Sequence, residues 1–213
     1  LDMGPEGIDH SVSNGEWLKS VVQKLVDPTL PPSVAPNKKF KATLREYQQK
    51  GINWLYFLHS LGFGACLADD MGLGKTIQVL GLLNILKSES AKSKGPKEAS
   101  LLVIPASLIA NWESEIRRFY PDLKVFIAHP GASLKKGSDA KSKKSLNGVD
   151  LCITTYALVQ RLGWLKDYSW NTIILDEAQA IKNPGTKQAR AIKNLTSQNR
   201  IIMTGTPIEN RLS

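Results

Sequence analysis

The chain has 213 residues, of which 42% are hydrophobic and 22% are charged, and its formal net charge is +9. This is an ordinary soluble globular composition, large enough for one core or for one core with an appendage. No stretch approaches the ~18 apolar residues of a membrane span, and the start lacks a secretory signal. The excess positive charge favours a polyanionic partner, nucleic acid before membrane, although a solvated lysine-rich surface explains the charge equally well.

The first 40 residues separate into two parts. Residues 1–27 contain an expected amphipathic helix, preceded by capping-box spacing between Ser13 and Glu16. Residues 28–40 carry four prolines, which predict a stiff extended linker. The helix is either the tail of an upstream domain or a clasp on the main body.

The main body spans residues 41–213 and alternates strands with helices. The expected strands are 63–68, 100–104, 124–128, 149–154, 171–175 and 200–203. The expected helices are 44–58 (with a capping pair at Thr43 and Glu46), 77–86, 108–119, 156–162 and 186–195. Two lysine-rich stretches, 87–99 and 131–148, are expected to be loops. The alternation predicts an α/β fold, a mostly parallel sheet with helices on both faces.

The two cysteines lie in apolar, strand-like runs of this body. We predict that Cys66 and Cys152 are buried, reduced thiols rather than a metal pair or a disulfide. Reduced thiols indicate a reducing compartment. That compartment is the cytoplasm, with association to the nucleoid, for a bacterial or archaeal protein, and the nucleus for a eukaryotic one.

A glycine-rich turn at residues 68–76 joins an apolar run to a helical pattern, which is the order that a phosphate-binding loop needs. Gly72 and Gly74 let backbone N–H groups turn toward phosphates, and the helix adds its positive end. Lys75 would reach the β- and γ-phosphates, and Thr76 would offer a hydroxyl to Mg²⁺. Asp69 departs from the general pattern, which has glycine at this position.

A second acidic site follows the strand at 171–175. Asp176 is placed to hold Mg²⁺, and Glu177 is placed to orient or deprotonate an attacking water. Because ligands collect at the carboxyl ends of parallel strands, these residues are expected to lie near the phosphate-binding loop.

Six motifs occur in a specific order, and together they carry a family resemblance. They begin at Leu44 (LREYQ), Asp69 (DDMGLGKT), Leu102 (LVIPASL), Thr154 (TTY), Asp176 (DEAQ) and Thr204 (TGTPIEN). From about Lys41 to its end, the chain resembles the first RecA-like lobe of the Swi/Snf-type DNA-dependent ATPases of helicase superfamily two. The resemblance also accounts for Asp69, since that family replaces the first glycine of the general pattern.

The resemblance implies a role for each matching position. Gln48 would read the adenine edge of ATP, and the loop residues Asp70, Met71, Gly72, Leu73, Gly74, Lys75 and Thr76 would bind the nucleotide. Lys75 and Glu177 would be catalytic, and Thr76 and Asp176 would bind Mg²⁺. The residues that link the nucleotide site to the DNA side would be Gln179, Thr204, Thr206 and Asn210.

The resemblance also implies a track for one DNA strand, held at its phosphates without sequence readout. The residues expected to form it are Pro105, Ser107, Leu108, Thr155 and Tyr156. Trp112 is interpreted as a core residue and is not counted in this track.

The implied function is ATP hydrolysis coupled to movement along double-stranded DNA, without strand separation. The family's arginine finger lies on a second RecA-like lobe that these 213 residues do not contain, so the lobe alone is expected to be nearly inactive. Two alternatives stay open: a lobe of an RNA helicase or restriction-type translocase, and a non-catalytic nucleic-acid-binding scaffold. A P-loop kinase or small GTPase fits the loop but not the DEAQ and TGTP motifs.

Overall fold

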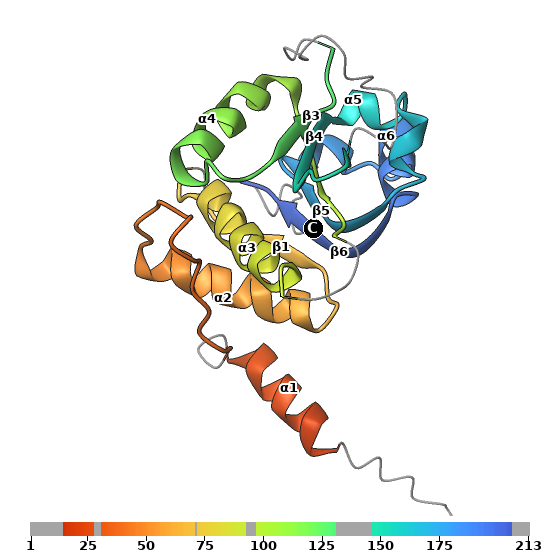
Figure 1. The fold of residues 1–213 in the computed structure, drawn as a ribbon. Coiled ribbons are helices and arrows are strands. Elements are labelled where there is room, and N and C mark those ends of the chain that lie inside the picture. Colours follow the sequence, from red (N-terminus) through yellow and green to blue (C-terminus); the bar gives the residue numbers. More distant parts are fainter. Residues whose placement is uncertain (1–14, 28–30, 71, 93–96, 131–145, 206–213) are drawn as a thin grey trace, which may run out of the picture.

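The computed structural model describes residues 15–27, 31–70, 72–92, 97–130 and 146–205 (Figure 1). In these ranges six strands form one sheet in the order β1-β6-β5-β2-β4-β3. Every neighbouring pair is parallel. The strands are β1 (Ala65–Leu67), β2 (Ser100–Ile104), β3 (Val125–Ile127), β4 (Leu151–Thr155), β5 (Ser169–Leu175) and β6 (Thr196–Met203). The predicted parallel α/β fold is therefore confirmed.

Helices cover both faces of the sheet (Figure 1). One core cluster contains residues of α2 (Glu46–Ser60), α3 (Lys75–Ser90) and α4 (Ile109–Phe119). A second cluster contains residues of α5 (Tyr156–Val159) and α6 (Lys187–Lys193). All five residues of β2 and of β4 are buried, as expected for central parallel strands. None of the described helices is long and apolar enough to cross a membrane.

Short 3₁₀ helices make several of the connections, at Ala106–Leu108 (η1), Gly163–Leu165 (η3) and Ala178–Ile181 (η4). Three of the expected boundaries differ most from the structure. The helix α3 continues to Ser90, into the stretch expected to be a loop. The strand β6 begins at Thr196 rather than at residue 200, because its polar first half is held by the ladder to β5. The helix expected at 156–162 is only the single turn of α5.

The predicted capping pairs do not begin their helices. The helix α1 (Glu16–Val26) has Gly15 at its N-cap, without a side-chain cap, and Ser13 lies outside the described residues. The helix α2 has Arg45 at its N-cap, two residues beyond Thr43. There the backbone N–H of Arg45 donates to Gln48 Oε1 at 3.0 Å, which replaces the expected cap.

The described part of the proline-rich segment is bound to the main body. The N–H of Val34 donates to Asn53 Oδ1 at 3.1 Å, and Gln49 Nε2 donates to the Val34 carbonyl at 2.6 Å. The N–H of Asn37 donates to Asn84 Oδ1 at 2.7 Å. These contacts fix the segment to α2 and α3, whereas α1 extends away from the sheet (Figure 1). The domain boundaries at residues 27 and 40 stay predictions.

The two cysteines differ in exposure. Both are free thiols, and Cys152 is buried as predicted. Cys66 is exposed, so the prediction for this residue was wrong. Cys66 lies on the edge strand β1 and is in register with Ile202 of β6, which is 39% exposed. The exposed pair shows that the described helices leave this corner of the sheet uncovered, which an apolar run in the sequence could not reveal.

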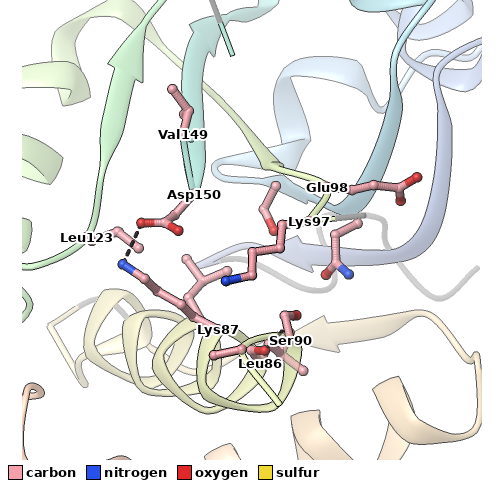
Figure 2. Close-up of a pocket in the computed structure, with 12 residues that line it drawn as sticks. Leu86, Lys87, Ser90, Lys97, Glu98, Leu123, Val149 and Asp150 are labelled. Carbon is pink, nitrogen blue, oxygen red and sulfur yellow. Dashed lines mark hydrogen bonds and ion pairs between the residues drawn. The ribbon is translucent and has the colours of Figure 1, made fainter. Parts of the chain in front are cut away.

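The amino ends of the strands enclose a cavity of about 110 Å³ (Figure 2). In Figure 2, Lys87 at the end of α3 points toward Asp150, which directly precedes β4. Lys87 Nζ lies 2.6 Å from Asp150 Oδ2 and donates to the Asp122 carbonyl at 2.9 Å. This ion pair joins the last turn of α3 to the start of the sheet.

Candidate nucleotide-binding site

The order of the strands brings the predicted nucleotide residues together. The strands β1, β6 and β5 are neighbours in the sheet. The carboxyl end of β1 leads into the loop at 68–76, that of β6 into Thr204, and that of β5 into Asp176. The strands β2 and β4 follow on the side of β5, and they lead into Pro105 and Tyr156. One edge of the sheet thus carries the nucleotide motifs on one half and the predicted DNA track on the other.

The loop after β1 has the backbone of an anion site. Gly72 and Gly74 have φ values of 84° and 82°, a region that favours glycine. A Cβ at Gly74 would lie 2.5 Å from Gln48 Nε2, so the Gln48 amide would have to move to accommodate a side chain there. Gly74 is the N-cap of the 16-residue α3, which has no side-chain cap and no acidic residue in its first turn. The first N–H groups of α3 and the positive end of its dipole are therefore left for an anion.

Lys75 and Asp69 hold the loop in shape. Lys75 Nζ donates to the carbonyls of Asp69 at 2.6 Å and Asp70 at 3.1 Å, so its ammonium lies across the loop. The Asp69 carboxylate accepts a hydrogen bond from Gln78 Nε2 at 2.9 Å. The aspartate that replaces glycine in this loop therefore braces it against α3.

Asp176 is buried at the end of β5, with 8% of its surface exposed. Its Oδ2 accepts a hydrogen bond from Trp112 Nε1 at 2.8 Å, and its Oδ1 accepts one from the Glu177 N–H at 2.9 Å. Burial raises the pKa of Asp176, while these two donors and the positive charge of Lys75 lower it, and the effect of burial dominates. The carboxyl group is therefore poorly solvated and close to the charge of the phosphate-binding loop.

Glu177 begins a chain of polar contacts that leads to β6. Its φ of 51° is the only positive value for a non-glycine residue in the described part of the chain. Gln179 Nε2 donates to Glu177 Oε2, and Gln179 Oε1 accepts a hydrogen bond from the Thr204 hydroxyl at 3.2 Å. Strained residues of this kind concentrate at functional sites. The contacts join two of the predicted linking residues, Gln179 and Thr204, directly to Glu177.

A cavity of about 590 Å³ opens beside the loop, between the start of α2 and α4. Its size is within the range of small-molecule sites. Gln48 lies in its wall, where its Nε2 donates to the Leu73 carbonyl at 3.2 Å. Tyr47 donates to the same carbonyl at 3.0 Å. The other lining residues are Lys41, Ala42, Thr43, Arg45, Gly72, Gly74, Ile77, Glu115, Arg118 and Phe119.

The residues predicted for the DNA track lie in two environments. Ser107 is exposed, and Pro105 and Leu108 are partly exposed. Thr155 and Tyr156 are each only 5% exposed. The Tyr156 hydroxyl donates inward to the Asp176 carbonyl at 2.7 Å, and the place of Tyr156 in the DNA track stays a prediction. Its position just after β4 turns the ring into the core.

Three site residues were missed by the sequence reasoning: Trp112, Gln78 and Glu115. Trp112 is buried, as predicted, but it also donates to Asp176. Glu115 lines the 590 Å³ cavity and interacts with the Thr76 hydroxyl. The i, i+3 spacing of Trp112 and Glu115, on a helix that begins at the ligand edge of the sheet, is a signal that could have found both.

Three of the predicted site residues, Met71, Thr206 and Asn210, lie outside the described residues.

The oxygen donors at this edge suit Mg²⁺ better than a metal that needs a complete protein cage. Mg²⁺ takes oxygen ligands and is usually held by one or two carboxylates together with substrate phosphates. The described residues include no group of three or more His, Cys, Asp or Glu that could hold a metal alone. The Asp176 carboxylate and the Thr76 hydroxyl lie beside an anion-binding loop. They fit the few protein ligands of a Mg²⁺ site whose other ligands are substrate phosphates and water.

The chain is similar to known proteins in sequence and in structure. The family model of the SNF2-related domain matches residues 47–213. The YwqA protein of Bacillus subtilis strain 168, provisionally named an ATP-dependent helicase/translocase, is 45% identical over 208 residues, which cover 97% of this chain and 22% of that protein. The chromatin-remodeling ATPase INO80 of Candida albicans is 38% identical over 220 residues, which cover 100% of this chain and 15% of that protein.

A solved structure agrees with these matches. The SWI2/SNF2 ATPase core of Sulfolobus solfataricus in complex with dsDNA aligns with a TM-score of 0.72 and 42% identity, over 85% of this chain and 36% of that one. The chain thus spans about a fifth or less of the curated relatives named above. The family assignment and the RecA-like fold expected from the motifs are confirmed, and the chain belongs to the SNF2-related domain family.

Proposed function

We propose that this chain is the nucleotide-binding lobe of an ATPase that moves along double-stranded DNA. The observation that carries the proposal is the meeting of three elements at one edge of the sheet. They are an anion-binding loop with an uncapped α3, the Asp176–Glu177 pair, and the polar link from Glu177 through Gln179 to Thr204. A sheet that only needed a stable turn after β1 would not require all three.

Each residue has a defined task in the proposed reaction. The Lys75 ammonium releases the loop carbonyls and binds the β- and γ-phosphates, where it neutralises charge. The Asp176 carboxylate and the Thr76 hydroxyl would hold Mg²⁺, which supplies charge neutralisation between the phosphates when bound. Glu177 accepts a proton from the attacking water, and Gln179 orients its carboxylate.

DNA is the proposed polymer, held at its phosphates. Support comes from the relative that was solved with dsDNA, and from Ser107 and Pro105, which lie accessible beside the nucleotide half of the edge. A serine hydroxyl such as that of Ser107 can donate to a phosphate without reading sequence. An RNA helicase with the same chemistry is the alternative. Stimulation of ATP hydrolysis by duplex DNA, and not by RNA of equal length, would separate the two.

The first test is Mg²⁺–ATP binding and hydrolysis by the 213-residue chain, with and without duplex DNA, beside Lys75→Ala. We expect binding that the substitution weakens about 10- to 100-fold. We expect negligible hydrolysis even on DNA, because an arginine finger worth about 10³–10⁵ in rate is expected from another lobe. Hydrolysis stimulated by DNA in this chain alone would mean that the site completes itself. A complete absence of binding would instead favour a scaffold without catalysis.

A further inference from the structure

The helix α4 presents two polar side chains to the groups that would bind Mg²⁺. Trp112 Nε1 donates to Asp176 Oδ2 at 2.8 Å. Glu115, three residues further along, lines the cavity of about 590 Å³ beside the phosphate-binding loop, and it interacts electrostatically with Thr76 and Asp176. Because residues three positions apart share a helix face, one face of α4 reaches both groups.

These contacts leave lone pairs free on the atoms that a cation would need. Asp176 accepts one hydrogen bond on each oxygen, from Trp112 and from the Glu177 N–H, and each oxygen keeps further acceptor capacity. The Thr76 hydroxyl oxygen likewise carries two lone pairs. Outer partners of this kind orient ligands and tune the affinity for a metal.

Resting on the proposed nucleotide-binding function, we propose that Trp112 and Glu115 are positioning residues of the metal site. They fix the Asp176 carboxylate and the Thr76 hydroxyl in the orientation that binds Mg²⁺ together with the nucleotide. α4 directly follows η1, which carries Ser107 of the predicted DNA track. A shift of α4 would therefore reach both metal ligands at once.

The chain offers a matched control for a tryptophan that has only a structural role. Trp170 is fully buried, and its Nε1 donates to the Leu165 carbonyl at 2.9 Å in the second core cluster. Trp112→Phe and Trp170→Phe each keep an aromatic ring in a core and each remove one buried indole donor. They differ in that only the Trp112 donor serves the proposed metal site.

The test is calorimetric titration of the folded 213-residue chain with ADP, once with excess Mg²⁺ and once with EDTA. The readout is the gain in affinity that Mg²⁺ brings. We expect Trp112→Phe to reduce this gain about tenfold or more, while its affinity in EDTA stays within about twofold of the parent, and Trp170→Phe to keep the gain. The proposal would be overturned if Mg²⁺ raised the ADP affinity of Trp112→Phe as much as that of the parent. It would also be overturned if Trp170→Phe lost as much of this gain in affinity as Trp112→Phe.

Glu115→Ala keeps the proposal testable if Trp112→Phe does not fold, as judged by circular dichroism. Glu115 is only partly buried, so its removal should be tolerated, and we expect the gain from Mg²⁺ to fall by about threefold or more. An unchanged gain in this variant would then reject the positioning role. If the parent chain binds no ADP at all, the proposed function itself fails, which is a distinct result.

Discussion

The two edges of the sheet each bring a lysine of α3 near an aspartate at the end of a strand, with opposite results. At the amino edge, Lys87 and Asp150 form a direct ion pair of 2.6 Å (Figure 2). At the carboxyl edge, Lys75 donates to loop carbonyls, and Asp176 accepts from Trp112 and a backbone N–H. Lys87 and Asp150 thus neutralise each other directly, whereas Lys75 and Asp176 are each hydrogen-bonded to other groups.

The difference teaches which charges are structural and which can serve a ligand. The amino edge surrounds a cavity of about 110 Å³, and the carboxyl edge opens into one of about 590 Å³. Burial raises the pKa of both Asp176 and Glu115, and Glu177 has a strained backbone. Strain and poor solvation at one edge, beside a larger cavity, are typical of a functional site.

The largest expected effect compares the two lysines directly. Lys75→Ala should weaken binding of Mg²⁺–ATP by about 10- to 100-fold, because a hydrogen bond to a charged phosphate is lost. Lys87→Ala, twelve residues or about 3.3 turns later on the same helix, should leave the affinity unchanged within about twofold. Calorimetric titration of both variants checks this. Equal losses would show that α3 as a whole, rather than its first turn, decides binding.

The next effect concerns stability at the amino edge. The side chains of Lys87 and Asp150 are 33% and 22% exposed, so their pair is between a surface and a buried ion pair. Lys87→Met should lower the free energy of unfolding by about 1–2 kcal/mol. Lys39→Met breaks a pair with Asp122 whose side chains are 65% and 52% exposed, and should cost at most about 0.5 kcal/mol. Urea titration measures both, and equal costs would contradict the ranking.

A smaller effect tests the strain at Glu177. Glycine adopts the left-handed region without the Cβ penalty, so Glu177→Gly should be more stable than Glu177→Ala by about 1 kcal/mol. Both substitutions remove the carboxylate, so the difference between them isolates the backbone. Thermal unfolding of the two variants gives the comparison. An alanine variant that is as stable as the glycine variant would mean that this residue is not strained.

The smallest effect is a dependence of stability on pH at the amino edge. His59 at the end of α2 has its pKa lowered by burial, and contacts with Asn171 and Glu89 offset this only in part. The unfolded chain therefore binds the proton more readily, so the free energy of unfolding should fall as pH drops below about 6.5. His59→Gln should remove this part of the slope. A parent and a variant with identical slopes between pH 7 and 5 would contradict the assignment.

Much of the nucleotide site followed from the sequence alone. The glycine-rich loop, Lys75 and the Asp176–Glu177 pair are local patterns, each attached to an apolar strand. Such a loop needs residues with positive φ, which glycine adopts most readily, and Gly72 and Gly74 do have positive φ values. The alternation of strands and helices likewise predicted a parallel sheet, and the central strands β2 and β4 are buried on both faces as such a sheet requires.

The contacts that these residues make with distant parts of the chain could not be predicted from local patterns. Trp112 looked like a core residue because an indole ring is mostly apolar, and only its Nε1, aimed at Asp176 from another element, makes it part of the site. Tyr156 looked accessible after its strand, yet its hydroxyl turns inward to the Asp176 carbonyl. Cys66 looked buried, and the lack of a covering element at the edge strand exposes it.

The sequence by itself determined the family and the order of the elements, and it predicted which residues bind phosphate, because these depend on short patterns and backbone geometry. The tertiary structure decided which of those residues meet. The position of β6 between β1 and β5 places Thr204 beside Glu177 through Gln179, and the path of α4 brings Trp112 to Asp176. Contacts between residues distant in the chain depend on strand order and helix packing, which no local pattern contains.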